Sequence, residues 1–492
     1  MAKSTRNNTL ASLTSSQSLS RKGRGRRLLF SRKEAIVNSN NNSAEMAEEQ
    51  KPPSWQILKE IGIELKKKHY VDDKEEDLES GATSPKCLRR TFGKDEEIRV
   101  HFYRDTASWC PYCETVWLLL EEKEIPYTVE KINMRCYGDK PKTFLSKVPS
   151  GMLPVVVIDG KLMTESSVIQ EELEKTFANK SMLPKKGTAE FDQAQKLLRL
   201  ERKLFSNWMS WLTGNWNDDA SRATFCETLD EVEMSLSMTP ESPYFLNSGF
   251  SLVDIKFAPF LERMAASLLY YKGLKIEGNT TSKRWKNVDN WFKNMSNRPT
   301  FRKIRSDYFT HVHDLPPQLG GCVENGTEEQ KKAVLAINGR DGVNWQLPLQ
   351  PLNESSFEPF WEVENAEKDR LEAAMQLTSN FEKIALFACR GASTVASKSK
   401  VSAPLSDPYA VPNVDYVEAV DLALRSVCSM LLRTDNNDLP TEKQITFSDA
   451  KMKENVSLSL EYLRDRVGVP RDMRMPAARQ FRAHLNFVIK NL

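Results

Sequence analysis

The sequence contains a single Cys-x-x-Cys motif and lacks the second Cys or His pair that would complete a four-ligand zinc site. It also lacks a P-loop and the glycine-rich fingerprint of dinucleotide-binding proteins. Histidine is scarce, and its five copies are His69, His101, His311, His313 and His484. Half of a zinc site is therefore the minor interpretation of the motif, and we expect no metal.

The chain has little net charge for its length. Its 70 Lys and Arg residues nearly balance 67 Asp and Glu residues, which leaves a formal net charge of +3 and argues against bulk nucleic-acid binding. A length of 492 residues with 40% hydrophobic content predicts two or three domains with buried cores. Eight cysteines without a short, regular framework favour a reducing compartment.

The first 33 residues contain no Asp or Glu and are rich in Ser, Thr, Lys and Arg. This composition is typical of an organelle transit peptide, and it fits a disordered basic tail equally well. A continuous apolar segment is absent, so neither a secretory signal nor a membrane helix is indicated there. We expect residues 1–50 to be disordered and the protein to be cytoplasmic or plastid.

The most informative segment is Cys110-Pro111-Tyr112-Cys113. It follows a β-type run, residues 98–103, and opens a helical pattern over residues 114–122. A helix N-terminus stabilises a thiolate over a thiol, so Cys110 is a candidate nucleophile that we expect to be exposed. Cys113 lies one turn further and can resolve a mixed disulfide on Cys110. Two inert buried cysteines remain an alternative.

The residues after the motif predict a thioredoxin-like order of elements, β-α-β-α-β-β-α. Residues 128–132 form a strand pattern, Met152–Ile158 reads as a buried strand, and Asp159-Gly160 is a strong hairpin signal. A proline normally argues against a central strand. Pro154 fits if the Leu153–Pro154 bond is cis and leaves the Leu153 backbone free to pair with a peptide ligand.

On these features, residues 97–310 resemble a soluble glutathione S-transferase, nearest the cysteine-type classes (omega, lambda and dehydroascorbate-reductase-like). The matching segments are Cys110–Cys113, Lys147–Pro154, Glu165-Ser166, Ser251–Asp254 and Arg298–Phe301. The resemblance implies a thioredoxin-like glutathione-binding domain over residues 96–180. It further implies an all-helical transferase domain over residues 188–313, in which Ser251 and Asp254 form a capping box that stabilises a core helix.

The resemblance also implies the site residues. Cys110 and Cys113 are the catalytic pair, and the glutathione site comprises Lys147, Leu153, Pro154, Glu165 and Ser166. Glu165 would accept from the γ-glutamyl ammonium, Ser166 would donate to the γ-glutamyl carboxylate, and Lys147 would pair with the glycyl carboxylate. An ordinary helix cap at Glu165-Ser166 and a solvated Lys147 are the alternatives.

Tyr112, Trp208 and Trp211 are the candidates for the second-substrate pocket. The two tryptophans belong to an apolar stripe of a helix that begins near residue 193, and Trp216 follows it. Such a stripe is more often part of the hydrophobic core than of a site.

The chain continues well beyond Asp314, which is longer than the transferase pattern needs. We expect residues 315–321 to be a connector and residues 325–492 to be a helical extension that is dispensable for thiol chemistry. Within residues 51–95 we expect a linker with a short amphipathic helix, residues 53–70, outside the core. The helices expected in the extension are residues 328–337, 366–389, 416–432, 450–466 and 476–492, with a loop over residues 393–413.

The sequence therefore predicts a glutathione-dependent thiol transferase or reductase that acts on mixed disulfides or on small oxidised substrates such as dehydroascorbate. Conjugation of glutathione to an electrophile is the second enzymatic possibility, and a non-catalytic scaffold with a vestigial site is the third. The expected partners are glutathione and a small-molecule or protein-disulfide substrate, and the family resemblance allows a homodimer. We expect neither a membrane nor a nucleic acid among the partners.

Overall fold

The computed structural model describes residues 51–69, 77–214, 217–279, 284–362, 365–399, 402–434 and 445–492. The basic segment over residues 1–50, with its expected transit peptide, and Trp216 lie outside the described residues. All described residues belong to one unit, Met46–Leu492. None of the described helices is both long and apolar enough to cross a membrane.

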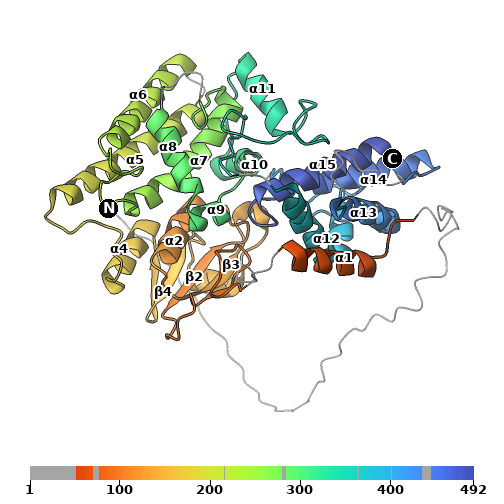
Figure 1. Ribbon diagram of the computed structural model, residues 1–492, viewed down its shortest axis with the longest axis horizontal. Helices are drawn as coiled ribbons and strands as arrows, with labels where there is room; N and C mark the ends of the chain where they lie inside the picture. Colours follow the sequence, from red (N-terminus) through yellow and green to blue (C-terminus); the bar gives the residue numbers. More distant parts are fainter. Residues whose placement is uncertain are drawn as a thin grey trace, which may run out of the picture. The chain divides into compact units, whose positions relative to one another are not determined.

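A five-stranded mixed sheet forms the first domain (Figure 1). Strand β2 pairs in parallel with β3 and antiparallel with β4, and β4 forms an antiparallel hairpin with β5. The hairpin turn, Asp159-Gly160, has positive φ at both residues, as a type I′ turn requires. The strands, in the spatial order β1-β3-β2-β4-β5, are β1 (Arg89–Arg90), β3 (Tyr127–Ile132), β2 (Val100–Asp105), β4 (Val155–Ile158) and β5 (Lys161–Thr164).

Three helices complete the thioredoxin-like order that the sequence predicts: α2 (Pro111–Glu122), α3 (Lys142–Lys147) and α4 (Ser166–Thr176). Helices α2 and α4 contact each other, whereas Phe144 of α3 packs in a separate small cluster with Tyr103 of β2. The edge strand β1 was not expected. Its Arg90 is buried and donates to both carboxylate oxygens of Glu121 at 2.9 and 2.8 Å, which ties β1 to the end of α2.

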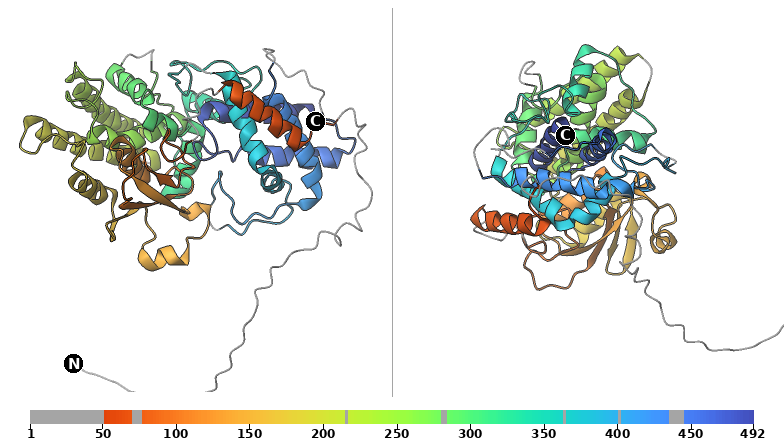
Figure 2. Two further views of the ribbon diagram at one scale, coloured as in Figure 1. Left: turned by 60° about the horizontal axis from the view of Figure 1, so that its bottom comes forward. Right: turned by 90° about the vertical axis from the view of Figure 1, so that its right-hand side faces the viewer.

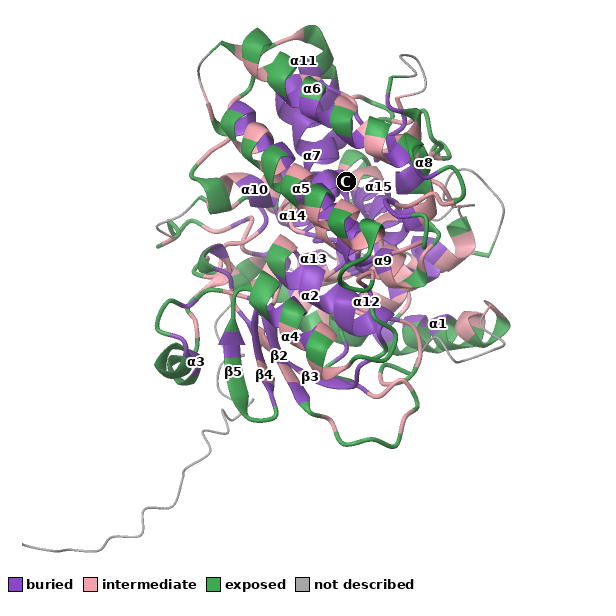
Figure 3. Cartoon of the chain, turned by 90° about the vertical axis from the view of Figure 1, so that its left-hand side faces the viewer, coloured by how far each residue is buried: buried purple, intermediate pink, exposed green. Residues whose placement is uncertain are grey.

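The helical domain is built around α7, whose residues are buried along almost its whole length (Figure 3). The expected capping box is present: Val253 N donates to Ser251 Oγ at 3.2 Å, and Ser251 N donates to Asp254 Oδ2 at 2.9 Å. The helices are α5 (Ala189–Thr213), α6 (Asp218–Ser237), α7 (Leu252–Lys272), α8 (Lys286–Ser296), α9 (Pro299–Ile304) and α10 (Tyr308–Leu319).

Helix α10 corrects the expected connector, because Pro316 and Pro317 lie inside it. Pro316 has no N–H to offer the Val312 carbonyl four residues earlier. The Tyr271 hydroxyl donates to that carbonyl instead, at 2.7 Å. The helix therefore continues to Leu319, and the boundary expected after residue 313 falls within it.

The extension first completes the transferase core. Helix α11 (Glu328–Ile337) contacts α7, and Ala333, Ile337 and Trp345 belong to the main hydrophobic core. The remaining helices of the extension are α12 (Ala366–Ala388), α13 (Val417–Leu431), α14 (Ala450–Arg464) and α15 (Met475–Asn491).

Helices α12 to α15 share a second hydrophobic core with the N-terminal helix α1 (Trp55–His69). Figures 1 and 2 show these helices side by side. The position of α1 corrects the expectation that it lies outside the core. Leu58 is fully buried, and the Trp55 ring stacks on Phe381 at 4.8 Å. Trp55 Nε1 also donates to Asp421 Oδ1 at 2.7 Å. An amphipathic helix must bury its apolar face, and α12 and α13 provide the surface.

The two cores meet where residues 306–310 contact residues 467–482, a contact that we call the seam. Arg482 pairs with Asp307 at 2.6 Å, and both side chains are 2% exposed or less. Val469 N donates to Thr310 Oγ1 at 3.1 Å, and Ser306 Oγ donates to the Val469 carbonyl. The extension is therefore joined to the transferase core by buried polar contacts, and its dispensability for thiol chemistry remains a prediction.

Candidate functional site

Cys110 occupies the N-cap position of α2, directly after the loop that follows β2. Its side chain forms no capping hydrogen bond, and Pro111 starts the helix. The thiol is half-buried rather than fully exposed. Because the first N–H groups of a helix have no partner within the helix, the sulfur lies where a negative charge is stabilised. This geometry is what a nucleophilic thiolate requires.

Cys113 lies beneath Cys110 and is 1% exposed. Burial raises the pKa of the Cys113 thiol well above its ordinary range, and a hydrogen bond to Cys110 and the Cys110 charge raise it further. Cys113 therefore stays protonated beside Cys110. The two cysteines differ as an attacking and a resolving thiol would, although burial alone also fits a packed, inert Cys113.

Asp105 and Lys140 join this pair, and the sequence analysis missed both. Asp105 ends β2, is buried, and accepts from Trp109 N at 2.7 Å, which shapes the loop before Cys110. Lys140 donates to the Asn133 carbonyl at 2.6 Å, and burial lowers the pKa of Lys140 while the charges of both cysteines raise it. The place of Asp105 at a strand end just before the motif could have been noticed, whereas nothing in the sequence marks Lys140.

Asp105, Cys110 and Cys113 are also the residues that could hold a metal. One donor atom from each lies within 4.8 Å of the other two, and this is the only such group of three in the described ranges. Structural zinc sites use four protein ligands, so the set is one ligand short. The expectation of no metal remains a prediction.

The Leu153–Pro154 bond is cis, as predicted. Strand β4 begins at Val155, which pairs with Tyr103. The Leu153 backbone forms no hydrogen bond with any residue that the structure describes. Its N–H and C=O groups are therefore available to an extended peptide, as the pairing of an added strand requires.

Glu165 is the N-cap residue of α4 and is exposed, yet its side chain does not cap the helix. Its φ of 67° lies in the left-handed region, which is unfavourable for a residue with a side chain. The alternative of an ordinary cap is therefore not what the structure shows. Ser166 starts α4, so its hydroxyl and the first N–H groups of the helix remain open to an anion.

Lys147 ends α3, where its Nζ donates to the Tyr103 hydroxyl at 2.9 Å. This hydrogen bond raises the pKa of Lys147, whose side chain is exposed. Among the described residues, no hydrogen bond or ion pair joins Lys147 to Cys110 or Glu165. The role of Lys147 toward a glycyl carboxylate therefore remains a prediction.

Tyr112 is 37% exposed, and its ring meets the edge of Phe260 at 5.5 Å. Trp208 and Trp211 are 2% and 1% exposed. Their indole N–H groups donate to Ser267 Oγ at 2.9 Å and to Asp218 Oδ1 at 2.8 Å. Both tryptophans are therefore core residues, which corrects their assignment to a pocket, and only Tyr112 presents an open surface.

A buried network of charges supports the loop before Cys110. Arg263 of α7 pairs with Glu114 at 3.0 Å and donates to the Trp109 carbonyl. Trp109 Nε1 donates to His311 Nδ1 at 3.0 Å, and the other ring nitrogen of His311 lies 2.6 Å from Glu262. Burial lowers the pKa of His311 far below its ordinary value, so the ring is neutral and can accept from Trp109. Helices α7 and α10 thus position the loop before Cys110.

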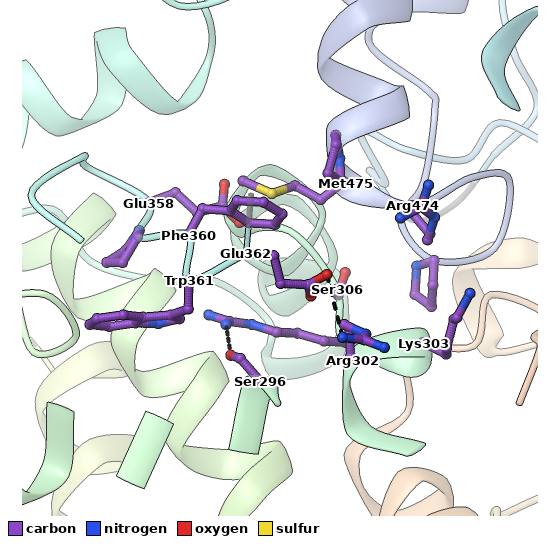
Figure 4. Close-up of a pocket in the computed structure, with 14 residues that line it drawn as sticks. Ser296, Arg302, Lys303, Ser306, Glu358, Phe360, Trp361, Glu362, Arg474 and Met475 are labelled. Carbon is purple, nitrogen blue, oxygen red and sulfur yellow. Dashed lines mark hydrogen bonds and ion pairs between the residues drawn. The ribbon is translucent and has the colours of Figure 1, made fainter. Parts of the chain in front are cut away.

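Four cavities lie along and beside the seam in the described part of the chain, and Cys110 lines none of them. Figure 4 shows one of about 50 Å³, in which Arg305 bonds to Ser296 at 3.0 Å and Arg302 lies 3.5 Å from Glu362. The others measure about 520, 630 and 30 Å³. The residues that the resemblance assigns to the thiol site are absent from all four linings.

Comparisons with known proteins identify relatives of this chain. The family model described as "Glutathione S-transferase, N-terminal domain" matches residues 109–176. "Glutathione S-transferase DHAR2" of Arabidopsis thaliana is 30% identical over 202 residues, which cover 41% of this chain and 86% of the relative. "Glutathione S-transferase DHAR3, chloroplastic" of the same plant is 26% identical, over 43% of this chain and 75% of the relative. The crystal structure of Chlamydomonas reinhardtii dehydroascorbate reductase covers 42% of this chain and 93% of its own, at 22% identity and a TM-score of 0.36.

Proposed function

Because this chain belongs to the glutathione S-transferase family, we propose that it is a glutathione-dependent thiol transferase or reductase that acts through Cys110. The observation that carries the proposal is the arrangement of Cys110 at the open N-terminus of α2, with the protonated thiol of Cys113 directly beneath it. A cysteine in this position forms a disulfide with glutathione, whereas a hydroxyl residue could only polarise the glutathione thiol.

The reaction on a glutathionylated substrate balances in two exchanges. The Cys110 thiolate attacks the glutathione sulfur of the mixed disulfide, a Cys110–glutathione disulfide forms, and the substrate leaves as a thiolate that takes up a proton. A second glutathione thiolate then attacks the glutathione sulfur, which releases oxidised glutathione and restores the Cys110 thiolate. With a protein disulfide, the Cys110 thiolate attacks one sulfur, forms a mixed disulfide and releases the other protein sulfur as a thiolate. The Cys113 sulfur, after losing its proton, then attacks the Cys110 sulfur, forms the Cys110–Cys113 disulfide and releases the second protein thiolate. Two glutathione molecules reduce that disulfide and leave as oxidised glutathione.

The residues around Cys110 fit glutathione, a tripeptide with a carboxylate at each end. The open Leu153 backbone suits its cysteinyl unit, and the N-terminus of α4 with Ser166 suits the γ-glutamyl carboxylate. The uncapped carboxylate of Glu165 suits the neighbouring ammonium. Dehydroascorbate, named in the crystal structure of the algal reductase, is our first candidate for a small oxidised substrate.

Calorimetry and activity assays on the full chain test the proposal. We expect wild-type protein to bind glutathione and Glu165→Ala to bind it about 10- to 100-fold more weakly, because a charge-assisted hydrogen bond is lost. We expect Cys110→Ser to bind glutathione but to lose turnover of mixed disulfides and dehydroascorbate. Wild-type protein that binds no glutathione would refute the proposal and favour a scaffold. A Cys110→Ser variant that still conjugates a model electrophile would favour simple conjugation.

A further inference from the structure

Glu201 interrupts the buried stripe of α5. The residue is 4% exposed, its buried Oε1 has no hydrogen-bond partner, and no ion pair joins its carboxylate to a described residue. Burial raises the pKa of Glu201 to about 7, and the charges of Arg202 and Lys256 oppose this shift. A buried acid without a partner destabilises the fold, so packing does not explain its presence. The other buried members of the stripe are Ala194, Leu197, Leu204, Trp208, Trp211 and Leu212.

Lys256 is the corresponding exception on α7. Every residue of this fully described helix is buried except Lys256, which is half-buried. Its Nζ donates to Ser167 Oγ at 3.1 Å, so the ammonium reaches the second residue of α4, next to Ser166. Burial lowers the pKa of Lys256 to about 8, and the charge of Glu201 opposes that shift.

Glu201 and Lys256 lie on neighbouring parallel helices, and the charge of each acts on the other. Phe205, one turn after Glu201, meets the edge of Phe260, one turn after Lys256, at 5.3 Å. Trp208 further along α5 bonds to Ser267 further along α7, so the two helices run in the same direction. The pair thus lies one turn before the aromatic contact, on the helical-domain side of the thiol site.

Tyr112 connects this pair to the thiol. Its ring contacts Phe260, and the charges of Cys110, Glu165 and Glu201 all act on its hydroxyl. Glu201 and Lys256 therefore lie on the helical-domain side of the region around Tyr112. Glu165 and Ser166 lie on its thioredoxin-like side.

We propose that Lys256 and Glu201 bind the α-amino acid end of glutathione, with Lys256 on the γ-glutamyl carboxylate and Glu201 on the ammonium. Adjacent opposite charges match a group that carries both charges on one carbon. An ammonium has three N–H donors, so Glu165 and Glu201 can both accept from it. In a purely structural ion pair Lys256 would bond to Glu201, whereas its hydrogen bond goes to Ser167 at the mouth of α4.

This inference rests on the proposed function. Binding of glutathione analogues distinguishes a failure of the inference from a failure of the proposed function. Calorimetry on the full chain would compare glutathione with an analogue that lacks the ammonium (glutaryl-cysteinylglycine) and one that lacks the γ-glutamyl carboxylate (4-aminobutyryl-cysteinylglycine). We expect Lys256→Met to bind glutathione about 10- to 100-fold more weakly and to bind the decarboxylated analogue like wild type. We expect Glu201→Gln to weaken glutathione similarly and to leave the deaminated analogue unchanged. Lys256→Arg should keep most of the affinity.

Lys203→Met is the matched control, because Lys203 is an exposed lysine of α5 that pairs with Glu231. It should bind all three peptides like wild type. If Lys256→Met and Glu201→Gln bind glutathione normally, or weaken all three peptides equally, the inference is wrong while the proposed function stands. If wild-type protein binds no glutathione, both fail. Thermal unfolding of each variant identifies affinity losses that come from misfolding.

Discussion

The substitution Arg482→Met tests how far the stability of the two hydrophobic cores depends on their contact at the seam. Arg482 is 1% exposed and lies over the rings of Phe309 and Trp345, 4.6 and 4.7 Å from their centres. It pairs with Asp307 at 2.6 Å and donates to the Val467 carbonyl at 2.8 Å. Methionine can fill much of the same space over the rings, so the substitution mainly removes the charge.

The expected cost is large because Asp307 would keep a buried charge without a partner. Breaking a buried ion pair from one side typically costs about 3–5 kcal/mol of unfolding free energy. Asp307 also caps α10, where its Oδ1 accepts from Thr310 N at 2.9 Å. Asparagine can keep that cap without a charge. The double variant Arg482→Met/Asp307→Asn should therefore be more stable than Arg482→Met alone.

Urea unfolding monitored by circular dichroism and by tryptophan fluorescence would measure these free energies. Arg284→Met is the control, since Arg284 pairs with Asp230 at the surface and such pairs contribute at most about 1 kcal/mol. A cost for Arg482→Met no greater than that of the control would refute the importance of the seam. Exactly additive costs in the double variant would refute the coupling of Arg482 to Asp307.

Three further predictions concern Cys113, Glu201 and the C-terminal extension. Cys113→Ser should accumulate a mixed disulfide with a protein substrate, visible by mass spectrometry, while glutathionylated substrates still turn over; unchanged ratios of all activities would mean that Cys113 is only packed. Glu201→Gln should become more stable relative to wild type as pH rises, because the folded-state pKa of about 7 exceeds the ordinary glutamate pKa of 4.5, so wild type loses stability between these pH values. The difference, on the order of 3 kcal/mol, should be complete above pH 7 in urea titrations, and a pH-independent difference would contradict the burial of a titrating acid. A chain that ends at Gly321 should unfold at a lower temperature than the full chain or be insoluble, because the main core loses Ala333, Ile337 and Trp345 and Asp307 loses Arg482; equal thermal stability of the shortened chain would contradict this dependence on the extension.

The features that the sequence predicts well are those specified by neighbouring residues. The thioredoxin-like order, the cis bond before Pro154 and the Ser251–Asp254 capping box are confirmed. Each depends on residues close together in the chain: alternating strand patterns, a proline before a strand, or a cap three residues from its partner. The helices of the extension are predicted within a few residues for the same reason.

The features that sequence reasoning missed depend on distant partners. Strand β1 has two residues, and its Arg90 is held by Glu121, which lies 31 positions later. Helix α10 passes through two prolines because the hydroxyl of Tyr271 replaces a missing backbone donor. Helix α1 belongs to the second core because Asp421, 366 positions away, accepts from Trp55. Local propensity contains no information about any of these contacts.

Glu201 differs from other buried charged residues in lacking an ion-pair partner in the described part of the chain, and this difference affects both the stability of the free protein and its proposed function. Arg482 with Asp307, Arg90 with Glu121 and Arg263 with Glu114 form ion pairs inside the chain. Glu201 is as deeply buried but has no such partner among the described residues. A charge that is neutralised internally stabilises one arrangement of helices, whereas a buried acid left open weakens the free protein and favours a complex that supplies a cation. Glutathione, with its ammonium next to a carboxylate that Lys256 can hold, would complete the site and stabilise the protein that binds it.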